Sequence, residues 1–157
     1  MTQTQVSKMA WHSIALMSLT SIHHVYGAII YSTPWRLHIL MLSIPVTALT
    51  LLLKLYFFKK KGKYRWVFKS AFLFITLVPS IGMIGVYEGL YNHVLKNILF
   101  FSGASQETLQ SMFPAPMYEM PNDFIFEVTG VMQGLIVVPM IVLLMKQRTF
   151  SFKTLIA

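Results

Sequence analysis

The sequence predicts an all-α integral membrane protein: an antiparallel bundle of four transmembrane helices, with an ordered extracytoplasmic loop between the third and fourth helices. Three observations lead to this fold class. Of the 157 residues, 55% are hydrophobic and only 11% are charged, whereas about a quarter of the residues in a soluble domain are charged. Four stretches are long and apolar enough to cross a bilayer as helices. Most lysines and arginines fall on one side of these stretches.

The composition also excludes several kinds of site. The chain contains no cysteine, so it has no disulfide framework, no thiolate metal site and no cysteine nucleophile. In a polar protein, the net charge of +8 would suggest nucleic acid as a partner. Here the basic residues flank apolar segments, so we expect them to set the orientation in the membrane and we expect no nucleic-acid partner.

Each predicted span has roughly 20 mostly apolar residues, and all four belong to one domain over residues 1–157. The spans cover about residues 9–31, 37–58, 67–90 and 124–145. The first is the most polar of the four, because it carries three histidines among serines and threonines. The second holds a single charge, Lys54, close enough to its end to reach the membrane interface.

The first connection predicts a tight turn that makes a hairpin of the first two spans. Thr33 is placed to cap a helix that begins at Pro34, where a proline needs no backbone donor. Tyr31 and Trp35 suit the aromatic belt at a membrane surface.

The connection between the third and fourth spans is much longer. Its first part, residues 94–101, is apolar enough to extend the third span or to lie on the membrane surface. Residues 113–121 contain three prolines, which predicts an ordered, extended cap instead of a helix.

The charges predict the orientation. A basic block from Lys59 to Lys69 lies between spans two and three, and every other lysine or arginine except Arg36 and Lys96 falls on the same side. All acidic residues lie between residues 88 and 127, toward the opposite face. The positive-inside rule then places both termini in the cytoplasm, and we expect a multi-pass protein of a bacterial inner membrane.

Glycines predict where the third and fourth spans approach each other most closely. The third span contains Gly82, Gly85 and Gly89, and the fourth contains Gly130 and Gly134. Small residues at such spacing let two helix backbones come close together inside a membrane.

Ionisable residues inside the spans are the main functional signal, because each is costly in hydrocarbon and is a functional-site hypothesis by default. At 1.5 Å of rise per residue, all four spans contribute such side chains to one level near the extracytoplasmic surface. These residues are His23, His24, His38, Glu88, His93 and Glu127.

Several chemistries require imidazole and carboxylate together in a protected place. Imidazole and carboxylate ligands suit a transition metal such as iron, zinc or copper, and two histidines on facing helices can hold haem b. A carboxylate–histidine pair can also perform acid–base chemistry on an apolar substrate, or line a proton or ion path. A polar cluster that only joins the helices through hydrogen bonds is the structural alternative.

The leading hypothesis is a transition-metal or haem site for redox chemistry, as in an oxidoreductase, or for metal handling. The alternatives are a metal-free acid–base enzyme or binder for a small apolar, lipid-like ligand, and a small structural subunit of a membrane complex or homo-oligomer. The predicted metal ligands are His24, His38, Glu88, His93 and Glu127. The predicted cofactor-binding residues are His23, His24, His38, Tyr31, Trp35 and Arg36. Glu88 and Glu127 are the candidate catalytic acids or bases.

Overall fold

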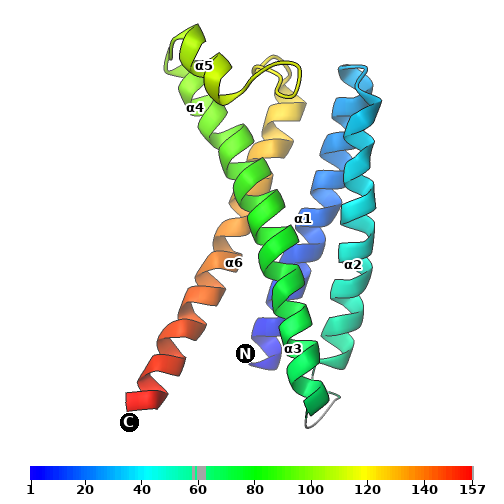
Figure 1. Ribbon diagram of the computed structural model, residues 1–157, viewed down its shortest axis with the longest axis vertical. Helices are drawn as coiled ribbons and strands as arrows, with labels where there is room; N and C mark the ends of the chain where they lie inside the picture. The colour runs from blue at the N-terminus through cyan, green and yellow to red at the C-terminus, as the bar shows by residue number, and fades with distance from the viewer. Residues whose placement is uncertain (58, 60–62, 157) are drawn as a thin grey trace.

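The computed structural model describes residues 1–57, 59 and 63–156, and no strand occurs among them. In chain order the helices are α1 (Gln3–Ile30), the 3-10 helix η1 (Pro34–His38), α2 (Ile39–Tyr56), α3 (Lys63–Ile75), the π-helix η2 (Thr76–Leu95), α4 (Lys96–Phe101), α5 (Gln106–Met112) and α6 (Phe124–Ile156). Figure 1 shows that α1 begins and α6 ends at one end of the molecule, here called the terminal end. The opposite end carries α5 and is called the α5 end.

Four helical segments are long and apolar enough to cross a membrane, namely Gln3–Ile30, Pro34–Tyr56, Trp66–Phe101 and Phe124–Lys146. This finding confirms the predicted number of spans and their approximate positions. The third span is longer than predicted because α3, η2 and α4 follow one another without a break. Residues 94–101 therefore extend the span, which was one of the two predicted alternatives.

The first span begins earlier than predicted because α1 has a polar cap. The Thr2 hydroxyl accepts a hydrogen bond from the Gln5 backbone N–H (3.3 Å), and the Gln5 side chain accepts one from the Thr2 N–H (2.8 Å). This reciprocal pair satisfies two backbone donors that would otherwise have no partner at the start of a helix.

The turn between α1 and α2 differs in one detail from the prediction. Thr33 does precede a helix that begins at Pro34, but its side chain makes no capping hydrogen bond. The Thr33 hydroxyl oxygen instead accepts a hydrogen bond from Arg36 Nε (2.8 Å). The turn also contains Ser32 in the left-handed region, with φ of 51°.

The π-helix η2 changes which residues of the third span share a face. Its backbone bonds join residues five apart, so each turn holds more residues than a turn of an α-helix. Positions five apart in an α-helix lie about 140° apart at 100° per residue, and the wider turn brings them closer together. Glu88 and His93 are five positions apart within η2.

The helices η2 and α6 pack most closely at glycines, as the sequence predicts. A Cβ atom added at Gly89 would meet the backbone of Gly134, and one added at Gly85 would meet the side chain of Val137. Larger apolar residues of α1, α2, α3, η2 and α6 form the core, in which Met9, Leu16 and Phe72 are fully buried.

Residues 113–121, the predicted cap, are non-helical, and the unpredicted helix α5 precedes them. Two tyrosines attach this region to the bundle: Tyr91 donates to the carbonyl oxygen of Met112 (3.0 Å), and Tyr31 donates to Asn122 Oδ1 (2.5 Å). These hydrogen bonds join both ends of the cap region to the bundle at the α5 end.

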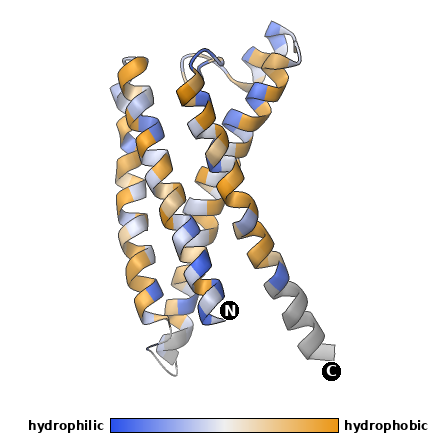
Figure 2. Ribbon diagram, turned by 180° about the vertical axis from the view of Figure 1, so that it is seen from behind, coloured by the Kyte–Doolittle hydropathy of each residue, from blue (hydrophilic) through white to orange (hydrophobic). Residues whose placement is uncertain are grey.

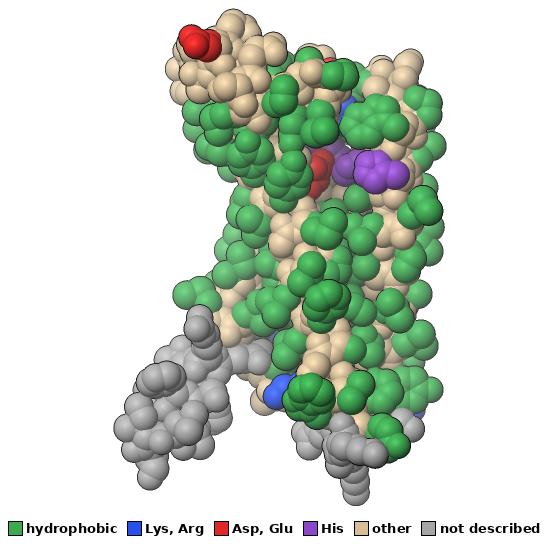
Figure 3. Space-filling view, viewed as in Figure 1, with side chains coloured by type: hydrophobic (Ala, Val, Ile, Leu, Met, Phe, Trp, Pro, Cys, Tyr) green, Lys and Arg blue, Asp and Glu red, His purple; other side chains and the backbone are tan. Residues whose placement is uncertain are grey.

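The outer surface of the bundle is apolar along its length. Hydrophobic residues follow all four spans in Figure 2, and they cover most of the face drawn in Figure 3. Exposed examples on three of the spans are Met41, Phe74 and Leu135. Part of the predicted basic block, including Lys60 and Lys61, lies outside the described residues.

We predict that Gly89→Ala destabilises the protein by about 1–3 kcal/mol, because an added methyl group at a close helix crossing forces the backbones apart. The matched control is Gly82→Ala. A Cβ at Gly82 would meet only the Leu77 carbonyl oxygen, at 3.3 Å, so its unfolding midpoint should stay close to that of the wild type. Thermal unfolding in detergent measures the midpoints of both variants. Equal midpoints for Gly89→Ala and Gly82→Ala would contradict the close packing at Gly89.

Candidate metal centre

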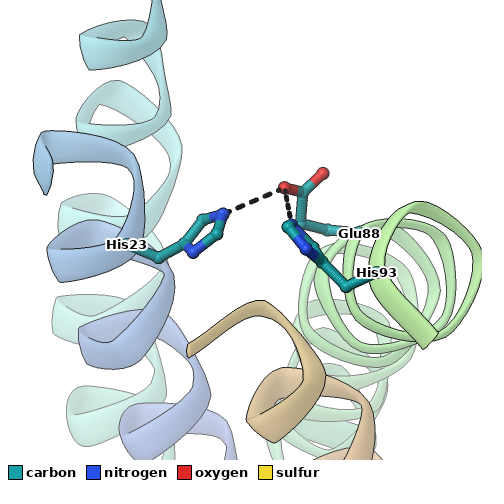
Figure 4. A group of neighbouring side chains, drawn as sticks. All are labelled: His23, Glu88 and His93. Carbon is teal, nitrogen blue, oxygen red and sulfur yellow. Dashed lines mark ion pairs between the residues drawn. The ribbon is translucent and has the colours of Figure 1, made fainter. Parts of the chain in front are cut away.

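The polar residues near the α5 end converge on one carboxylate oxygen. Glu88 Oε1 lies 3.6 Å from His23 Nε2, 3.6 Å from His24 Nε2 and 3.5 Å from His93 Nε2. Figure 4 shows His23 from α1 and His93 from η2 pointing toward Glu88 from two sides. The His23 and His93 side chains are almost completely buried, and the Glu88 side chain is 16% exposed.

These separations are too long for hydrogen bonds, whose N–O distances are about 2.7–3.2 Å. They are close to the spacing of metal ligands, since four atoms bound tetrahedrally at about 2.1 Å from an ion lie about 3.4 Å from one another. One ligand atom each from His23, Glu88 and His93 lies within 4.8 Å of the other two. The arrangement therefore leaves space for a cation between three donors.

The partners of the Nδ1 atoms identify which imidazole nitrogen carries the proton. His24 Nδ1 lies 3.0 Å from the carbonyl oxygen of Thr20, which can only accept. His23 Nδ1 lies 2.9 Å from Thr129 Oγ1, and that hydroxyl already donates to the carbonyl oxygen of Ile125 (2.8 Å). Both Nδ1 atoms are therefore donors, and in the neutral ring each Nε2 carries a lone pair.

His93 is held in the same way by a carboxylate. Its Nδ1 donates to Glu127 Oε2 (2.9 Å), so in the neutral ring its Nε2 also presents a lone pair to Glu88. Three lone pairs and a carboxylate oxygen thus face one another, and His23 Nε2 is buried without a hydrogen-bond partner among the described residues. Asn92 Nδ2 donates to the other Glu88 oxygen, Oε2 (2.7 Å). With all three rings neutral, Glu88 Oε1 and the three Nε2 atoms are all acceptors, which favours a bound cation between them.

Glu127 is itself fixed by two donors from α4. Lys96 Nζ lies 3.0 Å from Glu127 Oε1, and Asn97 Nδ2 donates to Glu127 Oε2 at 2.5 Å. Lys96 is 2% exposed and also donates to the carbonyl oxygen of Glu119 in the cap (2.6 Å). A carboxylate that holds the Nδ1–H of a ligating histidine is the common outer partner in metal sites.

Two features of the backbone bring these side chains together. The i→i+5 pattern of η2 turns His93 toward the same side as Glu88, although an α-helix would separate them widely. On α6, a Cβ atom at Gly130 would collide with the His93 ring. The absence of a side chain at Gly130 therefore creates the space for His93.

The two remaining predicted histidines lie at different distances from the centre. His24 reaches Glu88 Oε1 but does not belong to the group whose ligand atoms all lie within 4.8 Å. His38 is exposed, and its Nδ1 donates to the carbonyl oxygen of Trp35 (2.6 Å). The structure does not bring His38 to the centre as a ligand. Glu127 contacts the centre through His93, as an outer partner, and does not face the shared oxygen.

Tyr31, Trp35 and Arg36, which the sequence predicts as cofactor-binding, lie at the α1–α2 turn, where Tyr31 and Arg36 bond to Asn122 and Glu119. Arg36 is 6% exposed, and its guanidinium lies over the Trp35 ring (5.0 Å) and 3.4 Å from Glu119 Oε1. Burial and the nearby carboxylates of Asp123 and Glu127 raise the pKa of Tyr31 to about 12. Its hydroxyl therefore stays protonated and keeps its hydrogen bond to Asn122.

Two cavities of similar size lie on either side of the centre. The histidine-side cavity, about 650 Å³, lies between η2 and the η1–α2 segment, and its wall includes His24, His38 and Glu88. The Glu127-side cavity, about 630 Å³, is lined mainly by residues of α6, together with Asn97 and Phe101 of α4. The centre thus has an open approach on the side of Glu88 and His24.

Three residues around the centre were not predicted from the sequence, namely Lys96, Asn97 and Phe126. The Phe126 ring stacks on His23, with 4.1 Å between the ring centroids. One signal for Lys96 was present, because it is one of only two basic residues on the acidic side of the predicted spans. Asn97 follows His93 by four positions, a spacing that places two residues on one helix face.

Comparisons of the chain with protein-family models, with curated proteins and with solved structures gave no match. The geometry of the centre is therefore the basis for its functional interpretation.

We predict that Lys96→Met destabilises the protein by about 3–5 kcal/mol, because it leaves the buried Glu127 carboxylate without its cation. Adding Glu127→Gln to Lys96→Met should restore part of this stability, since the second change removes the unpaired charge. Thermal unfolding of the two variants tests both statements. Lys69→Met, at an exposed lysine of α3, is the control and should have little effect. A double variant less stable than Lys96→Met would contradict the pairing.

Proposed function

We propose that this protein binds one transition-metal ion inside the membrane, with His23, Glu88 and His93 as its ligands. The observation that carries the proposal is the convergence of three imidazole Nε2 atoms on Glu88 Oε1 at 3.5–3.6 Å. The fixed Nδ1–H groups add support, because they orient the rings before any ion binds.

Two imidazoles and one carboxylate suit iron or zinc and leave further coordination positions open. His24 lies next to those positions, 3.6 Å from the Glu88 oxygen, and could complete the ligand set. We favour the metal ion over haem b for a spatial reason. The His23 and His93 ring centroids are 4.7 Å apart, and Phe126 stacks on His23, so a macrocycle has no flat space between the two rings.

An open ligand set beside a cavity favours redox or Lewis-acid chemistry over simple storage of the metal. When bound, the ion would supply that chemistry. The residues of the chain would hold it, orient a substrate from the histidine-side cavity and exclude bulk water.

We also propose that the terminal end faces the cytoplasm. Figure 1 shows that α1 begins and α2 ends at this end, and in the sequence Lys8 lies five residues after the start of α1, while Lys54 and Lys59 flank the end of α2 at Tyr56. The positive-inside rule then places the metal centre and the cap near the opposite membrane surface.

A second candidate is a metal-free acid–base enzyme or binder for an apolar molecule. It is favoured by one observation, namely that Glu88 and His24 together line the histidine-side cavity. Under this alternative, activity would survive strong chelators and the purified protein would contain no stoichiometric metal.

Metal analysis of purified protein tests the proposal. Wild type loaded with Fe²⁺ or Zn²⁺ should retain about one ion per chain, the content of a mononuclear site. His23→Ala, His93→Ala and Glu88→Gln should each lower retention at least tenfold at limiting metal, because each removes a ligand.

Two histidine variants serve as controls. His12→Ala changes a histidine whose Nδ1 bonds the Lys8 carbonyl oxygen near the terminal end, and His38→Ala changes one that lines the cavity without reaching the centre. Both should retain the metal. Equal loss in these controls and in the ligand variants would count against the site, and so would a wild-type protein that retains no ion.

A further inference from the structure

The histidine-side cavity has the size of a ligand site and two chemically different parts. Its volume of about 650 Å³ lies within the range of roughly 300–1,000 Å³ for small-molecule sites. Leu77, Val78 and Met83 of η2 give one part an apolar wall. The other part, toward the α5 end, is lined by aromatic and polar side chains.

The cavity opens through a wall that faces the membrane. Leu77, Val78 and Met83 are 42–48% exposed, and all three belong to the span Trp66–Phe101. Figure 3 shows acidic and histidine side chains in a hollow of this face, framed by hydrophobic side chains. A molecule dissolved in the bilayer could therefore enter sideways without crossing water.

Three polar groups of the wall, His24, His38 and Glu88, present hydrogen-bond acceptors to the cavity. His38 Nδ1 donates to the Trp35 carbonyl oxygen (2.6 Å), so its Nε2 carries a lone pair in the neutral ring. His24 Nε2 and the Glu88 carboxylate are acceptors for the reasons given above. A ligand that is complementary to these three groups donates a hydrogen bond.

Aromatic rings surround these acceptors. The Trp35 and His38 rings are nearly parallel, with an interplanar angle of 14°, and the hydroxyl groups of Tyr87 and Tyr118 lie 2.5 Å apart. All four rings line the cavity. Flat aromatic walls favour a flat aromatic head group, because stacked or edge-to-face rings attract one another.

The apolar part is deep enough for an alkyl tail. Val78 precedes Glu88 by ten positions, a separation of at most about 15 Å along the helix axis. The cavity thus combines an acceptor-lined aromatic end near the centre with an apolar channel toward the middle of the membrane.

We propose that the histidine-side cavity binds a membrane-dissolved phenol, with its hydroxyl directed at Glu88, His24 and His38 and its alkyl tail along η2. The binding of the phenol follows from the cavity alone. A role of the bound phenol as the substrate of the metal centre rests on the proposed function.

Equilibrium binding of radiolabelled 4-octylphenol to purified full-length protein tests the inference, with its O-methyl ether and 1-dodecanol as competitors. The ether has nearly the same shape but no donor, so it should bind at least tenfold more weakly. The alcohol has a donor without a ring and should also bind at least tenfold more weakly. Phenol and ether of equal affinity, an alcohol as tight as the phenol, or no saturable binding would each overturn the proposal.

Variants locate the site. Val78→Trp fills the apolar part and should weaken phenol binding at least tenfold, whereas Val138→Trp on α6 should leave it unchanged. The two valines are similarly exposed, at 45% and 49%, but Val138 lines neither cavity described above. His38→Phe keeps a ring and removes an acceptor, so it should reduce the preference for phenol over ether. If Val138→Trp weakens binding as much as Val78→Trp, the cavity is not the binding site.

The metal content of the same preparations separates the two proposals. Val78→Trp and His38→Phe change no proposed ligand and should retain the ion. Retained metal without phenol binding would overturn this inference alone. Saturable phenol binding by a protein that takes up no metal would overturn the metal centre and leave the cavity proposal standing.

Discussion

The rest of the site depends on one constraint, a carboxylate oxygen placed among three imidazole nitrogens inside a membrane-spanning bundle. Charge in such surroundings is expensive unless it is paired. Glu88 Oε1 has Nε2 atoms of His23, His24 and His93 within 3.6 Å, yet the Nδ1–H groups of these rings point outward to other partners. The proposed cation would turn mutual repulsion between acceptors into coordination.

The surrounding residues keep this arrangement in place from three directions. Thr129 and Thr20 hold the α1 histidines, and Glu127 holds His93. Lys96 joins Glu127 to the cap through the Glu119 carbonyl oxygen, so the centre and the cap are parts of one hydrogen-bonded network. The cap therefore contributes to positioning the centre as well as covering the α5 end.

Backbone geometry decides which side chains can meet. The close crossing of η2 and α6 requires glycine at position 89, where a Cβ atom would meet the Gly134 backbone. It brings Glu127 of α6 to His93 of the third span, and Thr129 of α6 reaches His23 of α1. The wider turn of η2 brings His93 round to Glu88. Without both features, the same residues at the same depth would face different neighbours or the lipid.

The sequence by itself determined the number of spans, the non-helical cap, the glycine crossing and the level at which ionisable residues gather. These features follow from apolar length, proline, small residues and the rise per residue, all of which are local properties of the chain. The sequence could not decide which imidazoles share an oxygen, that His38 stays apart, or that Lys96 pairs with Glu127. Those outcomes depend on the turn width of η2 and on contacts between residues 31–106 positions apart. Only the tertiary structure fixes them, because helix rotation and crossing have no simple signature in a single sequence.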